Sequence, residues 1–231
     1  MKNIKDICLV VAARLGSHRV PQKMIAPFAN TTLLDIAMKK LIGSKVVPKE
    51  NIILAAHEPQ LIDIGEKYGI SVYRRSGESS RSEGKELTVL YDWHDKLDFK
   101  YVVLLNPCLP FLSIEIIDEF FLAYANSKDN GLFGVIAKKN YFWNSEGDLI
   151  TKWVDGLEIM NTKFVDVTYE AAHCLYASKL SLIKDGIWMG VAPYGKNNPP
   201  IYTIPEEQCF DIDYPWQFEL AEKMYESKYG L

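Results

Sequence analysis

A loop near the N-terminus, residues 13–23, holds a group of side chains suited to binding a chain of phosphates. It reads Ala-Arg-Leu-Gly-Ser-His-Arg-Val-Pro-Gln-Lys and follows an apolar run. Three of its side chains carry positive charge: Arg14, Arg19 and Lys23. Gly16 and Ser17 allow backbone amides to approach an anion, while guanidinium and ammonium groups bind phosphate oxygens. The loop predicts a polyphosphate site, with a solvated basic loop as the alternative, and it matches neither a P-loop nor a dinucleotide-binding turn.

Two aspartates near the C-terminus, Asp211 and Asp213, offer the complementary chemistry of a cation site. In an extended segment alternate side chains share one side, so this spacing points both carboxylates the same way. Such a pair suits a Mg²⁺ that also binds phosphate oxygens, although capping of the helix that follows is the alternative interpretation. Asp92 and Asp95 also share a face of a predicted helix, but they lie beside Lys96 in mid-helix and are interpreted as solvated surface charge.

Other reactive residue types form no motif. His18, His57 and His94 share no metal-ligand spacing, and a lone His173 at a predicted strand start is interpreted as structural. No serine or cysteine is paired by sequence with a general base. The four cysteines are scattered without a Cys-x-x-Cys pair, which indicates neither a zinc site nor a disulfide framework.

The size and charge of the chain limit its class. With 231 residues it is long enough for one α/β domain with its own core. Its formal net charge of −4 argues against a general nucleic-acid binder, which usually carries a basic excess. The apolar run at 7–13 is too short to span a membrane, and Arg14 follows it without a signal-peptide cleavage pattern. With the scattered cysteines, these features predict a cytoplasmic protein without a membrane or nucleic-acid partner.

Apolar runs that alternate with helical stretches indicate how these residues are positioned. Strands buried on both faces of a parallel sheet read as continuous apolar segments, and five are predicted: 7–13, 51–56, 70–73, 101–105 and 132–137. Helical spacing of apolar residues predicts helices between them, at 31–41, 59–68, 86–97 and 113–127. A strand, a short helix, a strand and a helix are predicted after them, at 173–177, 178–184, 201–204 and 215–227. The alternation predicts a doubly wound sheet, which binds ligands beyond the carboxyl ends of its strands.

Two segments interrupt this alternation. The polar loop at 74–85 is interpreted either as a lid over a polyphosphate or as a mobile solvated loop. Residues 138–170 combine a turn at 144–148 with several aromatic side chains, which is typical of a hairpin arm. Aromatic patches often mark a subunit interface, so the arm predicts a homodimer, with folding over its own domain as the alternative. The aromatic residues include Tyr141, Phe142, Trp143, Trp153 and Tyr169.

The first and last constellations together resemble those of the acylneuraminate cytidylyltransferases, the CMP-sialic acid synthetases and their pseudaminate, legionaminate and 3-deoxy-octulosonate relatives. Residues 13–23 resemble the first signature, roughly A-R-x-G-S-x-R-x-P-x-K-N, and residues 210–221 resemble the closing I-D-I-D-T-x-x-D-F-x-x-A segment. Residues 104–110 resemble a degraded L-L-Q-P-T-S-P, residues 75–76 an R-P pair, and residues 173–176 a G-x-Y strand. The order and separation of these motifs fit along almost the whole chain.

The resemblance implies a fold and an assembly. The fold would be a Rossmann-like nucleotide-diphospho-sugar transferase sheet in three α/β/α layers, formed by a single domain over residues 1–231. Residues 138–170 would be the dimerisation arm of a homodimer, reaching into the partner's active site. There Lys138 or Lys139 would help bind the acceptor carboxylate.

The resemblance also implies roles for individual residues. Arg14 and Lys23 would be catalytic by holding the triphosphate, and Asp211 and Asp213 would bind Mg²⁺. The nucleotide-binding residues would be Ala13, Arg14, Gly16, Ser17, Lys23, Arg75, Asn106 and Pro107. The substrate-binding residues would be Asn106, His173 and Tyr176.

The activity implied is transfer of a cytidylyl group from CTP to a nonulosonate-type sugar acid, with release of pyrophosphate. The chain departs from the family pattern at Met24, Ala56, His57, Asn106, Cys108, Leu109 and Leu112. In the family these positions contact nucleotide or acceptor. Two alternatives therefore stay open: a divergent, non-catalytic nucleotide-binding module, and a sugar nucleotidyltransferase that uses a different NTP.

Overall fold

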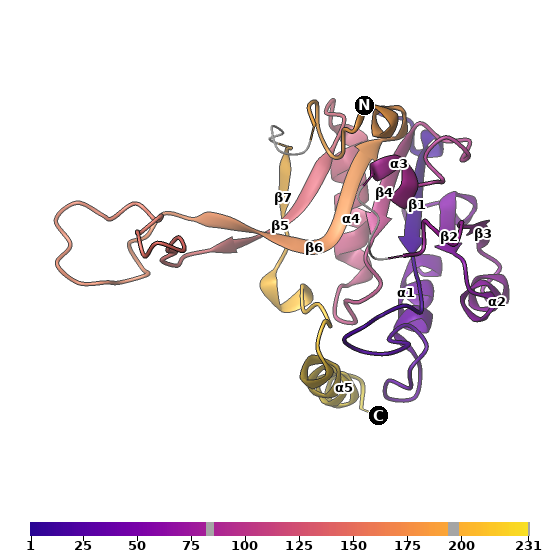
Figure 1. Ribbon diagram of the computed structural model, residues 1–231, viewed down its shortest axis with the longest axis horizontal. Coiled ribbons are helices and arrows are strands. Elements are labelled where there is room, and N and C mark those ends of the chain that lie inside the picture. The colour runs from indigo at the N-terminus through magenta and orange to yellow at the C-terminus, as the bar shows by residue number, and fades with distance from the viewer. Residues whose placement is uncertain (82–85, 194–198, 231) are drawn as a thin grey trace.

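The computed structural model describes residues 1–81, 86–193 and 199–230. Seven strands form one sheet in the order β3-β2-β1-β4-β6-β5-β7 (Figure 1). Their bounds are β1 Ile7–Ala12, β2 Ile52–Ala56, β3 Ser71–Arg74, β4 Tyr101–Leu105, β5 Leu132–Lys138, β6 Thr168–Lys179 and β7 Ile201–Thr203. β1 to β4 are parallel to one another, and β6 runs antiparallel to both of its neighbours, β4 and β5. The predicted α/β sheet is confirmed.

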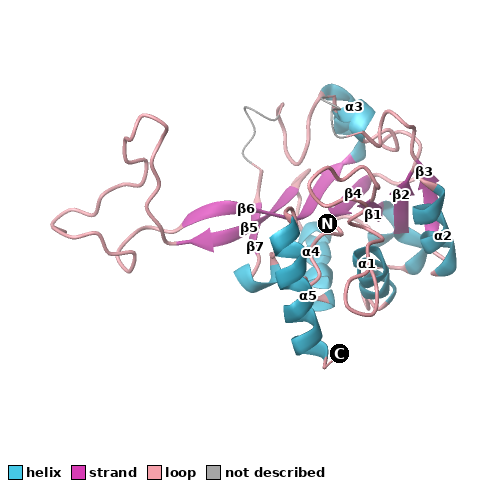
Figure 2. Cartoon of the chain, turned by 60° about the horizontal axis from the view of Figure 1, so that its bottom comes forward, coloured by secondary structure: helices cyan, strands magenta, loops and turns pink. Residues whose placement is uncertain are grey.

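The helices cover the two faces of the sheet unequally (Figure 2). One face carries the longer helices, α1 Leu33–Ile42, α2 Pro59–Lys67, α4 Ile114–Asn126 and α5 Pro215–Tyr229. The other face carries α3 Leu87–Leu90 and a 3-10 helix, Leu180–Asp185. Ile7 and Leu9 of β1 belong to the core on the first face, whereas Cys8 and Val10 belong to the core on the second. Because strand side chains alternate between faces, β1 is buried on both. Shorter 3-10 helices are Ile4–Asp6, Lys49–Asn51 and Glu206–Gln208.

Hydroxyl side chains cap the N-termini of two helices within the ranges predicted for them. The Thr32 side chain accepts a hydrogen bond from the Asp35 backbone amide at the start of α1, and Ser113 does the same for Ile116 in α4. Such caps satisfy amide groups that have no partner inside the helix. The predicted starts of these helices are confirmed.

A bulge interrupts β6, the strand between β4 and β5. Phe133 of β5 pairs with Tyr176, but Val135, two residues on, pairs with Ala171. His173 lies inside this bulge with a φ of 51°, a conformation that a histidine adopts only where its surroundings hold it there. Gly134 faces the bulge, and a Cβ there would lie 3.0 Å from the carbonyl oxygen of Leu175. This tight approach fixes how β5 and β6 pair.

Beyond the sheet, β5 and β6 lead into residues 139–167, which project away from the body (Figure 1). An isolated bridge between Trp143 and Leu149 surrounds the predicted turn. Tyr141 is only 5% exposed, because it packs against Trp143 and Trp153 with ring centroids 6.3 and 5.7 Å away. Tyr141 is thus already buried within one chain, and the aromatic side chains that the arm leaves exposed include Phe142, Trp143, Trp153 and Tyr169.

Three predicted elements differ in extent. The helix predicted at 86–97 ends at Leu90, since the next residues turn to bury Trp93 and to place Asp92 on a neighbouring loop. The strand predicted at 173–177 begins five residues earlier, at Thr168, because residues 168–171 pair with β5 alone. The helix predicted at 178–184 is the 3-10 helix over 180–185. The polar loop at 74–85 and the loop at 190–200 extend beyond the described residues. Within the described part of the chain, no helix is long and apolar enough to cross a membrane.

Candidate active site

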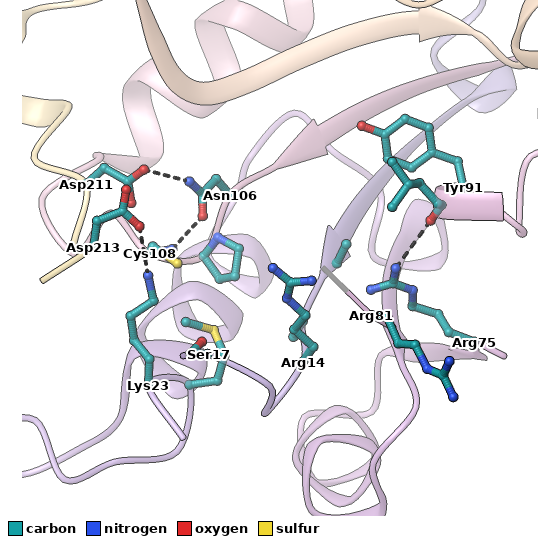
Figure 3. Close-up of a pocket in the computed structure, with 15 residues that line it drawn as sticks. Arg14, Ser17, Lys23, Arg75, Arg81, Tyr91, Asn106, Cys108, Asp211 and Asp213 are labelled. Atoms are coloured by element: carbon teal, nitrogen blue, oxygen red, sulfur yellow. Dashed lines mark hydrogen bonds and ion pairs between the residues drawn. The ribbon is translucent and has the colours of Figure 1, made fainter. Parts of the chain in front are cut away.

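A cavity of about 390 Å³ opens at the carboxyl ends of β1 and β4 (Figure 3). Most of the residues predicted for the site line it: Ala13, Arg14, Ser17, Lys23, Arg75, Asn106, Pro107, Asp211 and Asp213. Gly16 lines an adjoining recess of about 200 Å³ together with Arg19. The structure thus brings together segments that are almost 200 residues apart in the sequence, at the place expected for a ligand of such a sheet.

Helix α5 holds the two principal segments of the cavity next to each other. Phe28, in the loop after β1, packs edge-on against Phe218 and Tyr225 of α5, with centroid distances of 5.3 and 5.5 Å. The backbone amide of Ala29 donates a hydrogen bond to Glu222 at 2.7 Å. Because the aspartate segment directly precedes α5, these contacts fix it beside the basic loop.

Lys23 links the basic loop to the aspartate segment. It is only 7% exposed, and its Nζ donates a hydrogen bond to the backbone oxygen of Ile212. The same Nζ lies 3.7 Å from Oδ1 of Asp213, and Arg19 contacts that oxygen at 2.7 Å. Charge-assisted contacts of this kind fix both geometry and orientation. The basic loop and the aspartate segment therefore face the same cavity.

Asn106 connects three parts of the site. Its Nδ2 donates to the backbone oxygen of His173 at 2.8 Å and approaches Oδ2 of Asp211 at 3.4 Å. Its Oδ1 accepts a hydrogen bond from the backbone amide of Cys108 at 3.0 Å, the geometry of an Asx turn. One side chain thus fixes the end of β4, the β6 bulge and a candidate metal ligand.

The two aspartates present oxygen atoms that suit a hard cation. Oδ1 of Asp211 is buried and has no hydrogen-bond partner among the described residues, and both ionic contacts of Asp213 are made by its Oδ1. Burial, and then the charge of Asp213, raises the pKa of Asp211 above its usual range, although Lys23, His173 and Asn106 oppose this. Within the described part of the chain, no cluster of three or more typical metal ligands occurs. Mg²⁺ needs only one or two carboxylates when phosphates complete its coordination, so the donor set fits that ion.

Arg14 and Arg75 form the opposite side of the cavity. Glu58 accepts a hydrogen bond from the backbone amide of Leu15 at 2.9 Å and so holds the chain next to Arg14. Arg75 is 9% exposed. Burial lowers the pKa of its guanidinium, an effect that the Asp92 carboxylate opposes and the positive charge of Arg14 reinforces.

Two of the predicted substrate-binding residues do not line the cavity. His173 is exposed at the bulge, with Nδ1 3.3 Å from the hydroxyl of Tyr176. The Tyr176 ring stacks on Phe133 at 5.5 Å. The backbone of His173 is hydrogen-bonded to Asn106, the third predicted substrate-binding residue, which does line the cavity.

Several cavity residues were not predicted as site residues. These are Ala12, Met24, Arg81, Leu90, Tyr91 and Cys108. Met24 and Cys108 were noted only as departures from the family pattern, and burial raises the pKa of the Cys108 thiol to about 11. Two other departures, Leu109 and Leu112, are buried in the core and do not line the cavity. For Arg81, the only signal in the sequence was the basic character of the polar loop.

Comparison with known proteins identifies the family of the chain. Residues 8–229 match the family model described as cytidylyltransferase. The chain is 20% identical to a pseudaminic acid cytidylyltransferase of Campylobacter jejuni, over 96% of this chain and 97% of that protein. It is 33% identical to the spore coat polysaccharide biosynthesis protein SpsF of Bacillus subtilis, over 32% of this chain and 34% of that protein. Its fold superposes on a CMP:2-keto-3-deoxy-manno-octonic acid synthetase complexed with CTP, with a TM-score of 0.70, 11% identity, and coverage of 96% of this chain and 99% of the other.

Proposed function

Because this chain belongs to the cytidylyltransferase family, we propose that it activates a nonulosonate-type sugar acid with CTP, giving a CMP-sugar and pyrophosphate. The observation that carries the proposal is one cavity in which Arg14 and Lys23 lie with Asp211 and Asp213. A nucleoside triphosphate needs cationic groups along its phosphates, and its metal needs carboxylates. The acidic sugar of the Campylobacter relative supports the acceptor class.

In the proposed reaction, an acceptor hydroxyl attacks the α-phosphorus of CTP. The new oxygen–phosphorus bond replaces the bond to pyrophosphate, and the hydroxyl proton passes to water. Arg14 neutralises phosphate charge from one side of the cavity and Lys23 from the other. Their contribution is positioning and electrostatic stabilisation, since the reaction needs no covalent intermediate with the protein. Asn106 keeps the Asp211 carboxylate oriented while this happens.

We propose Mg²⁺ as the cofactor, held by Asp211 and Asp213. When bound there, it would neutralise phosphate charge and orient the α-phosphate. Support comes from the buried Oδ1 of Asp211, for which no described residue provides a partner. Asp213 is held in place by Arg19, which also lies over the Tyr214 ring at 4.9 Å.

We also propose a homodimer in the cytoplasm, with the arm at its centre. The support is the apolar surface that the arm exposes, because a two-stranded hairpin is marginally stable alone and one patch can serve both subunits around a two-fold axis. A role for Lys138 toward the acceptor carboxylate is less favoured, because Lys138 already pairs with Glu206 and lies 3.7 Å from Glu170. All four cysteines are free, which agrees with a reducing compartment.

The test of the activity is pyrophosphate release, screened over CTP, UTP, ATP and GTP with Mg²⁺ and a panel of sugar acids. We expect release with CTP and a nonulosonate-type acid, and none when the metal is chelated. Release with another NTP would contradict the choice of nucleotide. Tight binding of CTP without turnover on any acceptor would contradict the enzyme and favour the non-catalytic module.

A further inference from the structure

The polar loop after β3 is folded around a buried arginine. Arg75 donates through Nε to the hydroxyl of Ser79 at 3.0 Å, and through Nη2 to the backbone oxygens of Ser79 and, at 3.3 Å, Leu90. A guanidinium has five N–H groups, so these contacts occupy three of them. Ser79 has no exposed surface. Arg75 therefore acts mainly within the protein, as the anchor of its own loop.

Asp92 fixes the same loop from the other side. Its Oδ2 accepts a hydrogen bond from the backbone amide of Ser76 at 2.8 Å, and its Oδ1 lies 3.0 Å from the Ser79 hydroxyl. Asp95 instead pairs with exposed Lys96 at 3.0 Å. The interpretation of Asp92 and Asp95 as a solvated pair is thus wrong for Asp92. A carboxylate with two protein donors positions the chain rather than serving as surface charge.

The turn that follows adds one more cation to the lining of the cavity. The backbone amide of Arg81 donates to the Glu78 carbonyl at 3.1 Å, and the side chain lines the cavity on the same side as Arg75 (Figure 3). The Arg81 guanidinium makes no hydrogen bond or ion pair with any described residue. The guanidinium of Arg14, which also lines the cavity, likewise makes no hydrogen bond or ion pair with a described residue. Lys23, in contrast, already contacts Asp213.

We propose that Arg81 binds the phosphate chain of the nucleotide together with Arg14, and that Arg75, Ser79 and Asp92 are positioning residues for it. This rests on the proposed function for the identity of the nucleotide. Because a triphosphate carries several negative charges, unpaired guanidinium groups on one cavity wall give it new charge-assisted hydrogen bonds without breaking existing ones. A surface arginine that only faces solvent would add nothing measurable to the affinity for the triphosphate.

The test compares Arg81→Ala with Arg74→Ala. Arg74 begins the same loop and is exposed, as Arg81 is, but it pairs with Glu66 at 3.3 Å and does not line the cavity. We expect Arg81→Ala to raise KM for CTP at least about tenfold, with kcat within about threefold of wild type, since one charged hydrogen bond is lost. Arg81→Lys should recover part of the loss, and Arg74→Ala should match wild type. An unchanged KM for Arg81→Ala, or an equal rise for Arg74→Ala, would overturn the proposal.

The proposed positioning roles of Ser79 and Asp92 are tested with a second set of variants. Ser79→Ala should raise KM for CTP while the melting temperature falls only slightly, Ser79→Thr should restore it, and Asp95→Asn should have no effect. Amide hydrogen exchange at Ser76 should accelerate in Asp92→Asn, a readout that does not depend on the reaction. An unchanged exchange rate and an unchanged KM would show that the loop holds its shape without Asp92.

A direct binding measurement separates this proposal from the proposed function. Calorimetry with inorganic triphosphate reports contacts to phosphate without a base or an acceptor. If the wild type binds triphosphate but turns over no CTP, the proposed function fails, and weaker binding by Arg81→Ala still supports the phosphate contact. Equal triphosphate binding by wild type and Arg81→Ala, or no binding by either, overturns it.

Discussion

The cavity and the arm differ in how many of their side chains find partners within one chain. In the cavity, most polar groups find partners within one chain, as Lys23 does with Ile212 and Asp213. In the arm, many large apolar side chains remain exposed in the single chain: Phe142, Trp143, Ile150, Trp153, Ile159, Met160, Phe164, Val167 and Tyr169. Most large apolar groups of the sheet are buried, so this surface is not typical of the body. One chain is thus enough to arrange the cavity, whereas the apolar surface of the arm is what the proposed dimer would cover.

The largest effect is expected for a substitution of Lys23, which tests the cavity side of the comparison through kcat/KM. Lys23→Ala should lower kcat/KM on the order of 10²-fold or more, because it removes a buried cation from beside the phosphates. The measurement is steady-state pyrophosphate release, with circular dichroism to verify the fold. Lys39→Ala, an exposed lysine on α1, is the matched control. Near-normal turnover by Lys23→Ala would remove Lys23 from the catalytic residues.

The second-largest effect is expected in the arm, on the stability of the proposed dimer. Trp143 is 49% exposed in the single chain. Trp143→Asp should weaken the proposed dimer by about 30-fold, the effect of losing a central tryptophan of an interface. Light scattering over a concentration series should then show monomers of 26.3 kDa at concentrations where the wild type is dimeric. Trp216→Asp, which changes a tryptophan that is 59% exposed outside the arm, should not shift the mass. A wild type that is monomeric throughout would refute the dimer itself.

The smallest expected effect tests the cavity side of the comparison. It concerns Lys40, which lies beneath the loop after β4. Its Nζ donates to the backbone oxygens of Leu109 at 3.1 Å and Pro110 at 2.7 Å. Burial, and then the nearby Lys228, lowers the pKa of Lys40 from 10.5 to about 7. The unfolded chain therefore holds more protons than the folded chain between these values, so this lysine's contribution to the free energy of unfolding increases with pH across that window.

Lys40→Met should remove this dependence. Relative to the variant, the wild type should gain stability from pH 7 to pH 9 at no more than about 1.4 kcal/mol per pH unit. Urea unfolding at several pH values measures the difference, with Lys39→Met as the exposed neighbour for comparison. Parallel pH profiles for wild type and Lys40→Met would mean that Lys40 keeps an ordinary pKa.

The sequence was most informative where one physical requirement dominates. The strands of the central sheet were predictable because burial on both faces demands uninterrupted apolar residues, as in β1. That Lys23 and Asp213 line one cavity followed from the rule that ligand loops meet at one edge of the sheet. The end of α3 was not predictable, because helical spacing continued past Leu90 while burial of Trp93 decided the fold. The orientation of Arg81 depends on hydrogen bonds of Ser79, which leave no periodic pattern in the sequence.

The bulge at His173 also determines where the chain can tolerate insertions and deletions. Its offset against β5 is fixed on one side by Gly134 and on the other by Asn106. Residues added between 139 and 167 lengthen the arm without altering that offset, so arm length is free to vary. A single deletion among residues 172–174 would instead reverse the faces of the following strand, since a one-residue slip exchanges inward and outward side chains. The arm is thus open to changes in length, whereas the strand beside the cavity is not.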